Sequence, residues 1–154
     1  MKNWTILAFF LIFLSTKLLA QREEEAIKTV VTHLFTGMKT GDSTLSRSAF
    51  AKSCIMQTIV NKNEKLSVRT EQLDDFIKLI GSPHKEKFDE RIVFSKILID
   101  GPLATVWTDY KFYIDEKFSH CGVNSFQLAK LDNRWQIVYL IDTRRKDNCS
   151  SMIP

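Results

Sequence analysis

The sequence predicts an α+β fold in which helices pack on one face of a curved antiparallel sheet. Helical patterns occupy much of the first 80 residues and are interrupted by one hairpin pattern, whereas only strand patterns follow residue 90. The turns between those later strands are short, which is typical of antiparallel neighbours. This segregation of helices and strands indicates an α+β architecture rather than an alternating α/β one.

The strongest helix pattern lies between residues 23 and 42. Its apolar residues recur at helical spacing, three glutamates at 23–25 suit the positive end of the helix dipole, and Gly41 ends the pattern. Thr70 is the expected cap of a later helix. The other expected elements are a short helix over 43–50, strands over 54–60 and 65–70, a helix over 71–80, a polar loop to about residue 90, and strands over 91–99, 103–114, 117–131 and 134–143.

Residues 1–20 have the layout of a secretory signal peptide. Lys2 supplies a positive start, an apolar run spans residues 4–14, and the small Ala20 precedes an expected cleavage before Gln21. The run is shorter than the roughly 20 apolar residues of a transmembrane helix, and an uncleaved N-terminal anchor is the alternative. We therefore expect residues 21–154 to form one exported domain, periplasmic or secreted, with no stable membrane anchor after cleavage.

Charge and motifs argue against several classes of function. The chain has a formal net charge of +4, and loss of Lys2 and Lys17 with the signal peptide leaves +2, scattered among acidic residues. Such a surface does not indicate a nucleic-acid partner. There is no CxxC and no HExxH motif, so we expect neither a metal site nor a cofactor.

Turn lengths predict the register of the last three strands. If residues 115–116 and 132–133 are two-residue turns, side-chain alternation assigns each residue to a face. The expected facing pairs are Ile114 with Lys117, Leu131 with Arg134, Phe126 with Tyr139, Asn124 with Ile141, His120 with Arg145, Lys111 with His120, and Trp107 with Asn124. The face expected to lie under the helices carries Trp107, Asp109, Lys111, His120, Asn124, Phe126, Leu128, Ile137, Tyr139, Ile141 and Thr143. A slip of one residue would exchange the two faces.

The strand pair "ILIDGPLATVWTDYKFYID" and the closing hairpin "SFQLAKLDNRWQIVYLIDT" resemble the nuclear transport factor 2-like superfamily, which includes ketosteroid isomerases and SnoaL-like cyclases. The resemblance covers about residues 23–143 and is nearest to exported bacterial members of uncharacterised role, which carry a similar "SHCGVNSFQL" and "DTRRKDNC". It implies a cone, in which helices cover the concave face of a bent sheet and leave a pocket at the open end. It does not imply a reaction, because the same fold hosts enzymes, transport factors and binding modules.

Two residues are candidates for catalysis on this register. Asp109 is expected to lie diagonally from His120 and to hold its ring in one tautomer, leaving the other nitrogen free for proton transfer. The plainer alternative is a polar sheet rim. The candidate ligand-binding residues are Trp107, Asn124, Tyr139 and Arg145.

Each ligand-binding candidate has an expected role. Trp107 and Tyr139 would supply flat walls for a ring-shaped ligand, and Asn124 would add a hydrogen-bond donor. Arg145 would attract a carboxylate or phosphate at the pocket mouth. For the arginines the alternative is a surface ion pair with Asp142.

The chain has three cysteines, an odd number for an exported protein. Cys121 and Cys149 are expected to meet if the C-terminal tail turns back across the sheet edge, and a disulfide there would pin the tail. Cys54 would then stay buried as a small apolar residue. The alternative is three free thiols.

These observations favour an exported protein that binds a small, partly apolar molecule in a concave pocket. A first alternative is a cofactor-independent lyase, isomerase or hydrolase that uses His120 and Asp109 as an acid/base pair. A second is a homodimeric interaction module that uses the outer face of the sheet. The outer face is expected to carry Val106, Tyr110, Phe112, Val123, Val138 and Leu140.

Overall fold

The computed structural model describes residues 2–62, 65–83 and 85–149, with side chains from residue 18 onward. Three helices and six strands lie within this part of the chain. In chain order they are α1 (Lys2–Thr40), α2 (Ser43–Ser48), β1 (Phe50–Lys62), β2 (Lys65–Glu71), α3 (Leu73–Gly81), β3 (Phe88–Asp100), β4 (Leu103–Ile114), β5 (Lys117–Leu131) and β6 (Arg134–Arg145).

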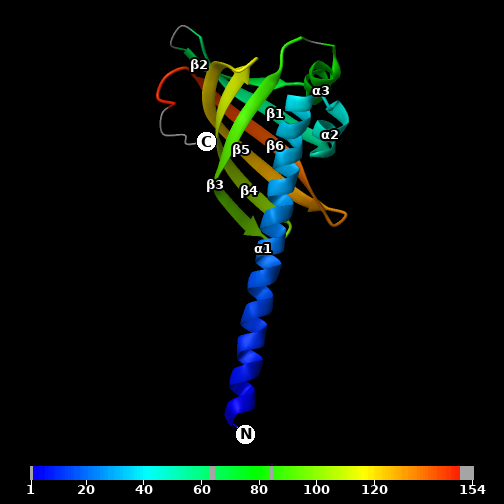
Figure 1. The fold of residues 1–154 in the computed structure, drawn as a ribbon, viewed down its shortest axis with the longest axis vertical. Coiled ribbons are helices and arrows are strands. Elements are labelled where there is room, and N and C mark those ends of the chain that lie inside the picture. Colours follow the sequence, from blue (N-terminus) through cyan, green and yellow to red (C-terminus); the bar gives the residue numbers. More distant parts are fainter. Residues whose placement is uncertain (1, 63–64, 84, 150–154) are drawn as a thin grey trace.

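The six strands form one bent sheet with the order β2-β1-β6-β5-β4-β3. Figure 1 shows α1 lying across this sheet, with α2 and α3 beside its C-terminal end. The predicted α+β class, with helices on the concave face, is therefore confirmed. One detail differs from the antiparallel sheet expected, because β1 pairs with β6 in parallel. The early hairpin and the late meander thus belong to one sheet.

Helix α1 begins at Lys2, whereas the sequence pattern predicts a start near residue 23. No glycine or proline interrupts the chain between these positions, so nothing in the local sequence stops the helix earlier. Among the described residues, no helix has both the length and the hydropathy that crossing a membrane requires.

Several element boundaries also differ from expectation. Thr70, the expected helix cap, lies in β2 and accepts a hydrogen bond from Gln57 at 3.1 Å, and α3 starts after Gln72 with no side-chain cap. Residues 88–90, expected in a loop, form the start of β3. These three residues alternate partly exposed, buried and partly exposed, as expected of a strand within a sheet.

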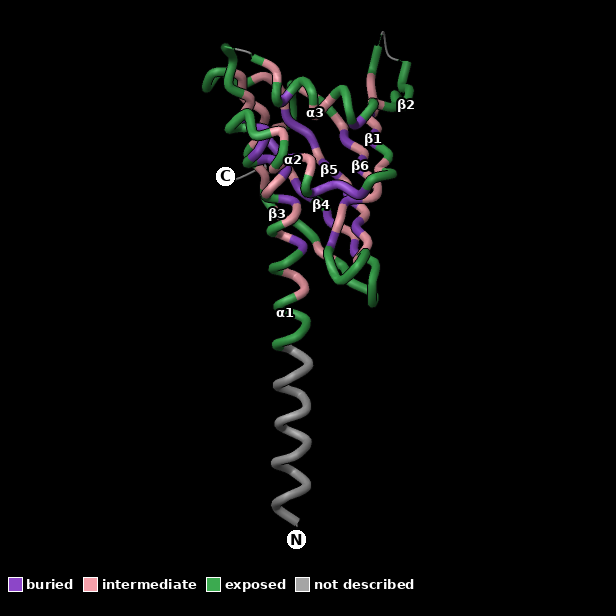
Figure 2. Tube along the Cα trace, turned by 90° about the vertical axis from the view of Figure 1, so that its right-hand side faces the viewer, coloured by how far each residue is buried: buried purple, intermediate pink, exposed green. Residues whose placement is uncertain are grey.

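The core lies between α1 and the sheet, and Figure 2 shows buried segments along the middle of the strands and on α1 where it passes the sheet. Ile27, Val31 and Leu34 form the buried stripe of α1 and are at most 1% exposed. Phe35 meets Phe126 of β5 edge to face, with ring centroids 6.2 Å apart. Each such side chain contributes about 1.5 to 3 kcal/mol through burial, so this stripe is what holds the helix to the sheet.

A polar contact fixes the α1 segment near residue 23 to the closing hairpin. The Glu23 carboxylate accepts hydrogen bonds from Lys130 Nζ at 2.7 and 2.8 Å and from Trp135 Nε1 at 2.7 Å. Trp135 is 5% exposed, so its indole N–H needs this partner. The contact joins residues more than 100 positions apart in the chain.

Single-residue bulges change the register of the sheet. The predicted pairs at the two turns, Ile114 with Lys117 and Leu131 with Arg134, are confirmed. Beyond the turns, Ser119 in β5 and Val138 in β6 are extra residues, and each shifts the pairing by one.

The predicted pairs beyond the bulges are therefore wrong. The pairs in the structure are Phe126 with Leu140, Asn124 with Asp142, Cys121 with Arg145, Phe112 with His120, and Trp107 with Ser125.

The bulges redistribute side chains between the face under α1 and the opposite face, here called the convex face. Of the residues expected under the helices, Ile137 and those in β5 are there. The others lie on the convex face: Trp107, Asp109, Lys111, Tyr139, Ile141 and Thr143. Conversely, Val106, Tyr110, Phe112 and Leu140, expected on the outside, lie under the helices.

Cys121 and Cys149 form a disulfide, and Cys54 is a free thiol. The bond attaches the chain after β6 to β5 and closes a loop with a sequence separation of 28. Cys54 packs partly against the core, and burial raises the pKa of its thiol to about 11, so it stays protonated and unreactive at neutral pH.

The disulfide predicts a redox-dependent stability. Reduction, or Cys149→Ser, is expected to lower the free energy of unfolding by about 3 to 4 kcal/mol, because the unfolded chain regains the entropy of an open loop. Urea denaturation with and without reductant measures this. Cys54→Ala serves as the control and should keep the response to reductant. Equal stability of oxidised and reduced wild-type protein would contradict the prediction.

Candidate functional site

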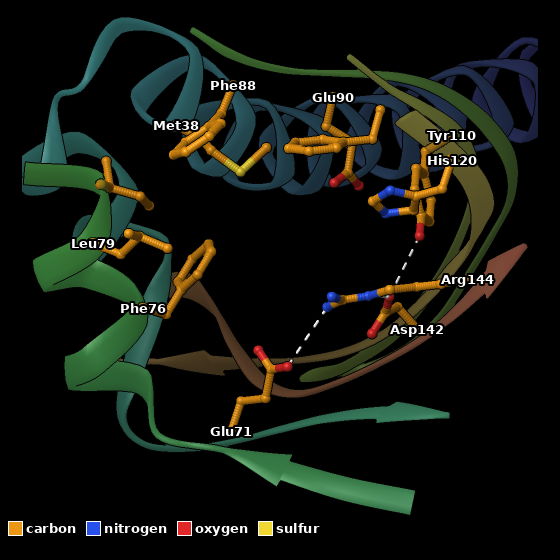
Figure 3. Close-up of a pocket in the computed structure, with 12 residues that line it drawn as sticks. Met38, Glu71, Phe76, Leu79, Phe88, Glu90, Tyr110, His120, Asp142 and Arg144 are labelled. Atoms are coloured by element: carbon orange, nitrogen blue, oxygen red, sulfur yellow. Dashed lines mark hydrogen bonds and ion pairs between the residues drawn. The ribbon is translucent and has the colours of Figure 1, made fainter. Parts of the chain in front are cut away.

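A cavity of about 260 Å³ opens on the concave side, between the sheet and helices α1 and α3. Figure 3 shows apolar side chains on the helix side and charged side chains across the hollow from them. The cavity is lined by Met38, Glu71, Phe76, Leu79, Ile80, Phe88, Glu90, Tyr110, Phe112, His120, Asp142 and Arg144.

The helix-side wall follows from the amphipathic pattern of α3. Leu73 and Ile80 of this helix are buried in the core, which turns Phe76 and Leu79 toward the hollow. Met38 from the last turns of α1 adds a flexible apolar side chain. This wall can accept an apolar body without offering it a hydrogen bond.

A row of rings forms the next side of the cavity. Phe88 and Phe112 have centroids 6.1 Å apart, Phe112 and His120 5.0 Å, and His120 and Tyr110 5.7 Å. The contacts are tilted or edge-to-face, the arrangements that aromatic pairs prefer. The row comes from β3, β4 and β5, so the rigid sheet sets its position.

Gly122 lets Tyr110 reach its position in this row. A Cβ at Gly122 would collide with the carbonyl oxygen of Thr143 and with the Tyr110 ring, so only glycine fits. The Tyr110 hydroxyl donates to the Thr143 carbonyl oxygen at 2.8 Å and lies 3.4 Å from an Asp142 carboxylate oxygen. Burial, with the negative charges of Glu90 and Asp142, raises the pKa of Tyr110, so the hydroxyl stays protonated.

Glu90 is a partly buried carboxyl group whose side chain points into the cavity (Figure 3). Its Oε1 accepts a hydrogen bond of 2.8 Å from Asn124 Nδ2, which also lies 3.3 Å from the Thr108 hydroxyl. Burial, and then the negative charge of Asp142, raise the pKa of Glu90 to about 7, although the Asn124 hydrogen bond opposes this. Glu90 can therefore both hold and release a proton at neutral pH.

A chain of ion pairs crosses the floor of the cavity. Arg69 donates to Glu71 at 2.7 Å, Glu71 lies 3.7 Å from Arg144 Nη2, and Arg144 Nε donates to Asp142 at 2.8 Å. Two cations and two carboxylates alternate along this chain, so their charges balance. Arg144 is thereby held across the hollow rather than extended into solvent (Figure 3).

His120 presents its ring to the cavity, with Nδ1 3.1 Å from the Ser119 hydroxyl. Burial, and then the positive charges of Arg144 and Lys146, lower the pKa of His120 below its ordinary value. The ring is therefore uncharged at neutral pH and can accept or donate one hydrogen bond through the nitrogen that Ser119 leaves free.

The structure brings together only two of the six candidate catalytic and ligand-binding residues. His120 lines the cavity and Asn124 supports Glu90 from beneath. Asp109, the expected partner of His120, is on the convex face, where its carboxylate accepts a hydrogen bond from Ser95. The expected His120–Asp109 contact is therefore absent, and the bulge at Ser119 is the reason.

Three expected ligand-binding residues also lie outside the cavity. Trp107 is 46% exposed on the convex face, and Tyr139 donates to Gln57 on that same face at 2.6 Å. Arg145 pairs with Cys121 on the convex face, and its neighbour Arg144 occupies the cavity instead. The positions of Tyr139 and Arg145 follow from the extra residue Val138, and that of Trp107 follows from the extra residue Ser119.

Sequence reasoning missed most of the polar residues of the site. Glu90 was placed in a loop, although alternation from Phe88 onward continues the pattern of β3 and was a usable signal. Asp142 and Arg144 were assigned to the wrong face, and nothing local in the sequence marks the bulge that reverses them. Among the described residues, no group of three or more His, Cys, Asp or Glu side chains is arranged to hold a metal ion.

The raised pKa of Glu90 predicts a fall in stability with rising pH. The folded state holds the Glu90 proton up to about pH 7, whereas the unfolded chain releases it near 4.5, so stability is highest below the lower value and declines toward the upper one. Glu90→Gln should remove this decline, on the order of 2 kcal/mol between pH 5 and 8. Urea denaturation at several pH values measures it, with Asp109→Asn as the control. Parallel pH profiles for wild type and Glu90→Gln would contradict it.

The family of the chain is shown by comparison with known proteins. The family model described as "Putative lumazine-binding" matches residues 22–140, which is most of the chain. No curated protein sequence matches the chain significantly.

Solved structures share the fold at low sequence identity. An NTF2-like (nuclear transport factor 2-like) protein of unknown function from Shewanella baltica is 20% identical, with a TM-score of 0.64 over 82% of this chain and 96% of the other. An NTF2-like protein with a cystatin-like fold from Novosphingobium aromaticivorans is 10% identical, with a TM-score of 0.67 over 90% and 92%. A protein described as a "putative dehydratase from the NTF2-like family" of Streptomyces avermitilis is 11% identical, with a TM-score of 0.64 over 82% and 98%. The chain therefore belongs to the family described as "Putative lumazine-binding", and it shares its fold with the NTF2-like solved structures.

Proposed function

We propose that this protein binds a small, partly apolar molecule in the cavity between α3 and the sheet. The observation that carries the proposal is the division of the cavity into an apolar helix-side wall and a charged opposite wall. Binding sites for small molecules are typically concave and mostly apolar, with a few placed polar groups that orient the ligand. A cavity of about 260 Å³ suits a ligand of one or two rings.

The ring row favours a flat ligand. Phe88, Phe112 and His120 offer successive ring surfaces along one side, and Phe76 faces them from α3. The family description names lumazine, a flat bicyclic heterocycle, and this makes lumazine the first compound to test. Glu90 and His120 would contact the polar edge of such a ligand.

We further propose that the protein is exported and acts outside the cytoplasm. The charged start, apolar run and small residue before Gln21 support this, as does the disulfide between Cys121 and Cys149. A protein beginning at Gln21 would retain Glu23 and so its contact with Lys130.

Filling the cavity is expected to abolish binding. Leu79→Trp should place an indole in the hollow and weaken lumazine binding at least tenfold, because the ligand and the new ring would compete for one volume. Ligand-observed NMR and isothermal titration calorimetry measure the affinity, and native mass spectrometry shows any co-purified molecule and the mass of the processed chain. Lys78→Trp, which adds the same ring to the exposed side of α3, is the matched control.

The outcomes of this experiment separate binding from catalysis. Equal affinity in wild type and Leu79→Trp would show that the ligand lies elsewhere and contradict the proposal. Catalysis is the second candidate, because Glu90 has a pKa of about 7 and faces the cavity beside His120, as a general acid/base near neutral pH should. Conversion of the bound ligand that stops in Glu90→Gln, while binding persists, would favour it.

A second copy of the chain is the partner that we propose for the convex face. Large apolar side chains are exposed on this face near both ends of the sheet, on β2 and β1 at one end and on β4 and β3 at the other. Lys96 and Asp109 place both signs of charge among them, which a two-fold arrangement can pair. The exposed apolar residues of this face are Ile55, Val68, Val93, Leu98 and Trp107.

Trp107→Lys is expected to convert this dimer to a monomer. A charge in place of a buried aromatic side chain at an interface costs several kcal/mol of association free energy, roughly what the loss of an aromatic anchor costs. Sedimentation velocity over a range of concentrations measures the change. Thr36→Lys, which adds the same charge on the solvent side of α1, should leave the dimer intact. A wild-type protein that is monomeric at all concentrations would contradict the proposal.

A further inference from the structure

The charges around the cavity do not balance once Glu90 is counted. Arg69, Glu71, Arg144 and Asp142 neutralise one another along the ion-pair chain. Glu90 stands apart from this chain, and among the described residues it has no ion pair with a lysine or arginine. Its one hydrogen bond is the neutral one from Asn124. The cavity therefore holds one carboxyl group without a cationic partner.

Glu90 offers the cavity an acceptor oxygen that no group of the described residues has taken. Tyr110 has already used its hydroxyl proton on the Thr143 carbonyl, and Asn124 has turned its amide nitrogen to Glu90. Within the described part of the chain, Glu90 Oε2 accepts no hydrogen bond, and the free nitrogen of the uncharged His120 ring accepts or donates one according to its tautomer. Arg144 still has N–H donors on Nη1 and Nη2, but its positive charge is already offset by Asp142 and Glu71.

We propose that the ligand of this cavity carries an ammonium group, which binds Glu90 while the ligand's apolar body lies against Phe76, Phe88 and Phe112. This inference rests on the proposed function, since it specifies the chemical class of molecule that the same cavity binds. An ammonium offers three donors and no acceptor, which matches the free acceptor oxygen of Glu90. The positive charge supplies the partner that Glu90 lacks, and the nearby ring faces attract it further.

The same arrangement disfavours a carboxylate ligand. A carboxylate at Arg144 would have to displace Asp142 or Glu71, or share the guanidinium with them. It would also lie near the ionised form of Glu90, and like charges repel strongly in a partly buried site. The expectation from sequence that an arginine at the pocket mouth attracts an anion therefore does not carry over to Arg144.

Ammonium binding should strengthen as pH rises from 6 to 8. The charged or titratable groups that face Glu90 are Tyr110, His120, Asp142 and Arg144, with Glu71 across the hollow, whereas α1 and α3 contribute only apolar side chains. The pKa of Glu90, about 7, lies inside this range. Its ionised fraction rises from about one tenth to about nine tenths, so an ammonium ligand that needs the carboxylate gains about tenfold in affinity.

A matched series of ligands tests the inference. Tryptamine, tryptophol and indole-3-propionate share a flat bicyclic body and differ in carrying an ammonium, a hydroxyl or a carboxylate. Titration calorimetry with the full chain at pH 8 should rank tryptamine first, with indole-3-propionate at least tenfold weaker. Tryptamine alone should gain about tenfold between pH 6 and pH 8.

Variants locate the selectivity. Glu90→Gln keeps an acceptor for Asn124 but removes the charge. The affinity of tryptamine should therefore fall about tenfold, to that of tryptophol, and should no longer depend on pH. Asp109→Asn removes a carboxylate from the convex face of the same sheet and should change neither. Two results would overturn the inference while leaving the cavity as a binding site. One is that tryptamine still has the highest affinity of the series for Glu90→Gln, and the other is that indole-3-propionate has the highest affinity for the wild type. If neither lumazine nor any compound of this series binds at millimolar concentration, the proposed function is wrong, and this inference is wrong with it.

Discussion

Two extra residues in the sheet determine the character of the cavity. Ser119 in β5 and Val138 in β6 each oppose no residue of their own on the neighbouring strand, so each reverses the alternation of side chains beyond it. Tyr110, His120, Asp142 and Arg144 then point toward α1 and α3 together. If one of the two bulges were missing, the side chains of one strand beyond it would point to the opposite face, and the polar residues would no longer line the same cavity.

The bent sheet and α1 provide the rigid part of the site, and α3 completes it. Phe126, Leu128 and Ile137 are fully buried against the stripe of α1, so the strands below the cavity cannot shift independently. The two sides of the cavity have opposite effects on the free energy of folding. Apolar side chains on α3 stabilise the fold by leaving water, whereas the buried carboxyl group of Glu90 costs free energy whenever it is ionised. Retention of such a group in a hollow is more easily explained by what it binds than by what it contributes to folding.

The sequence predicted the parts of the molecule that depend on local pattern. The helical stripe of residues 27–38, the turns at 115–116 and 132–133, and the four late strands all follow from periodicity and turn chemistry. Asp115, Glu116, Asp132 and Asn133 all have positive φ, as a two-residue hairpin turn requires. The sequence also predicts the correct face for His120 and Asn124, because β5 alternates without interruption from His120 to Leu128.

Register across several strands could not be predicted in the same way. A bulge is fixed by packing between strands, and neither Ser119 nor Val138 has a local signature that distinguishes it from its neighbours. The error moved Asp109 and Trp107 into the expected site and Arg144 out of it. Glu90 is missed for a different reason, because a charged residue near the start of a strand resembles the end of a loop, and only the alternation that begins at Phe88 marks it as part of β3.

The contact of Glu23 with Lys130 and Trp135 links α1 to a hairpin that is synthesised more than 100 residues later. A growing chain that has reached only β4 therefore has no partner for Glu23 and lacks the strands that cover the α1 stripe. The domain closes only when its last two strands are available, which gives it a late, non-local folding step. During synthesis, the apolar face of α1 is exposed for longer than that of any other helix in the described chain, and it is this face that needs protection from aggregation.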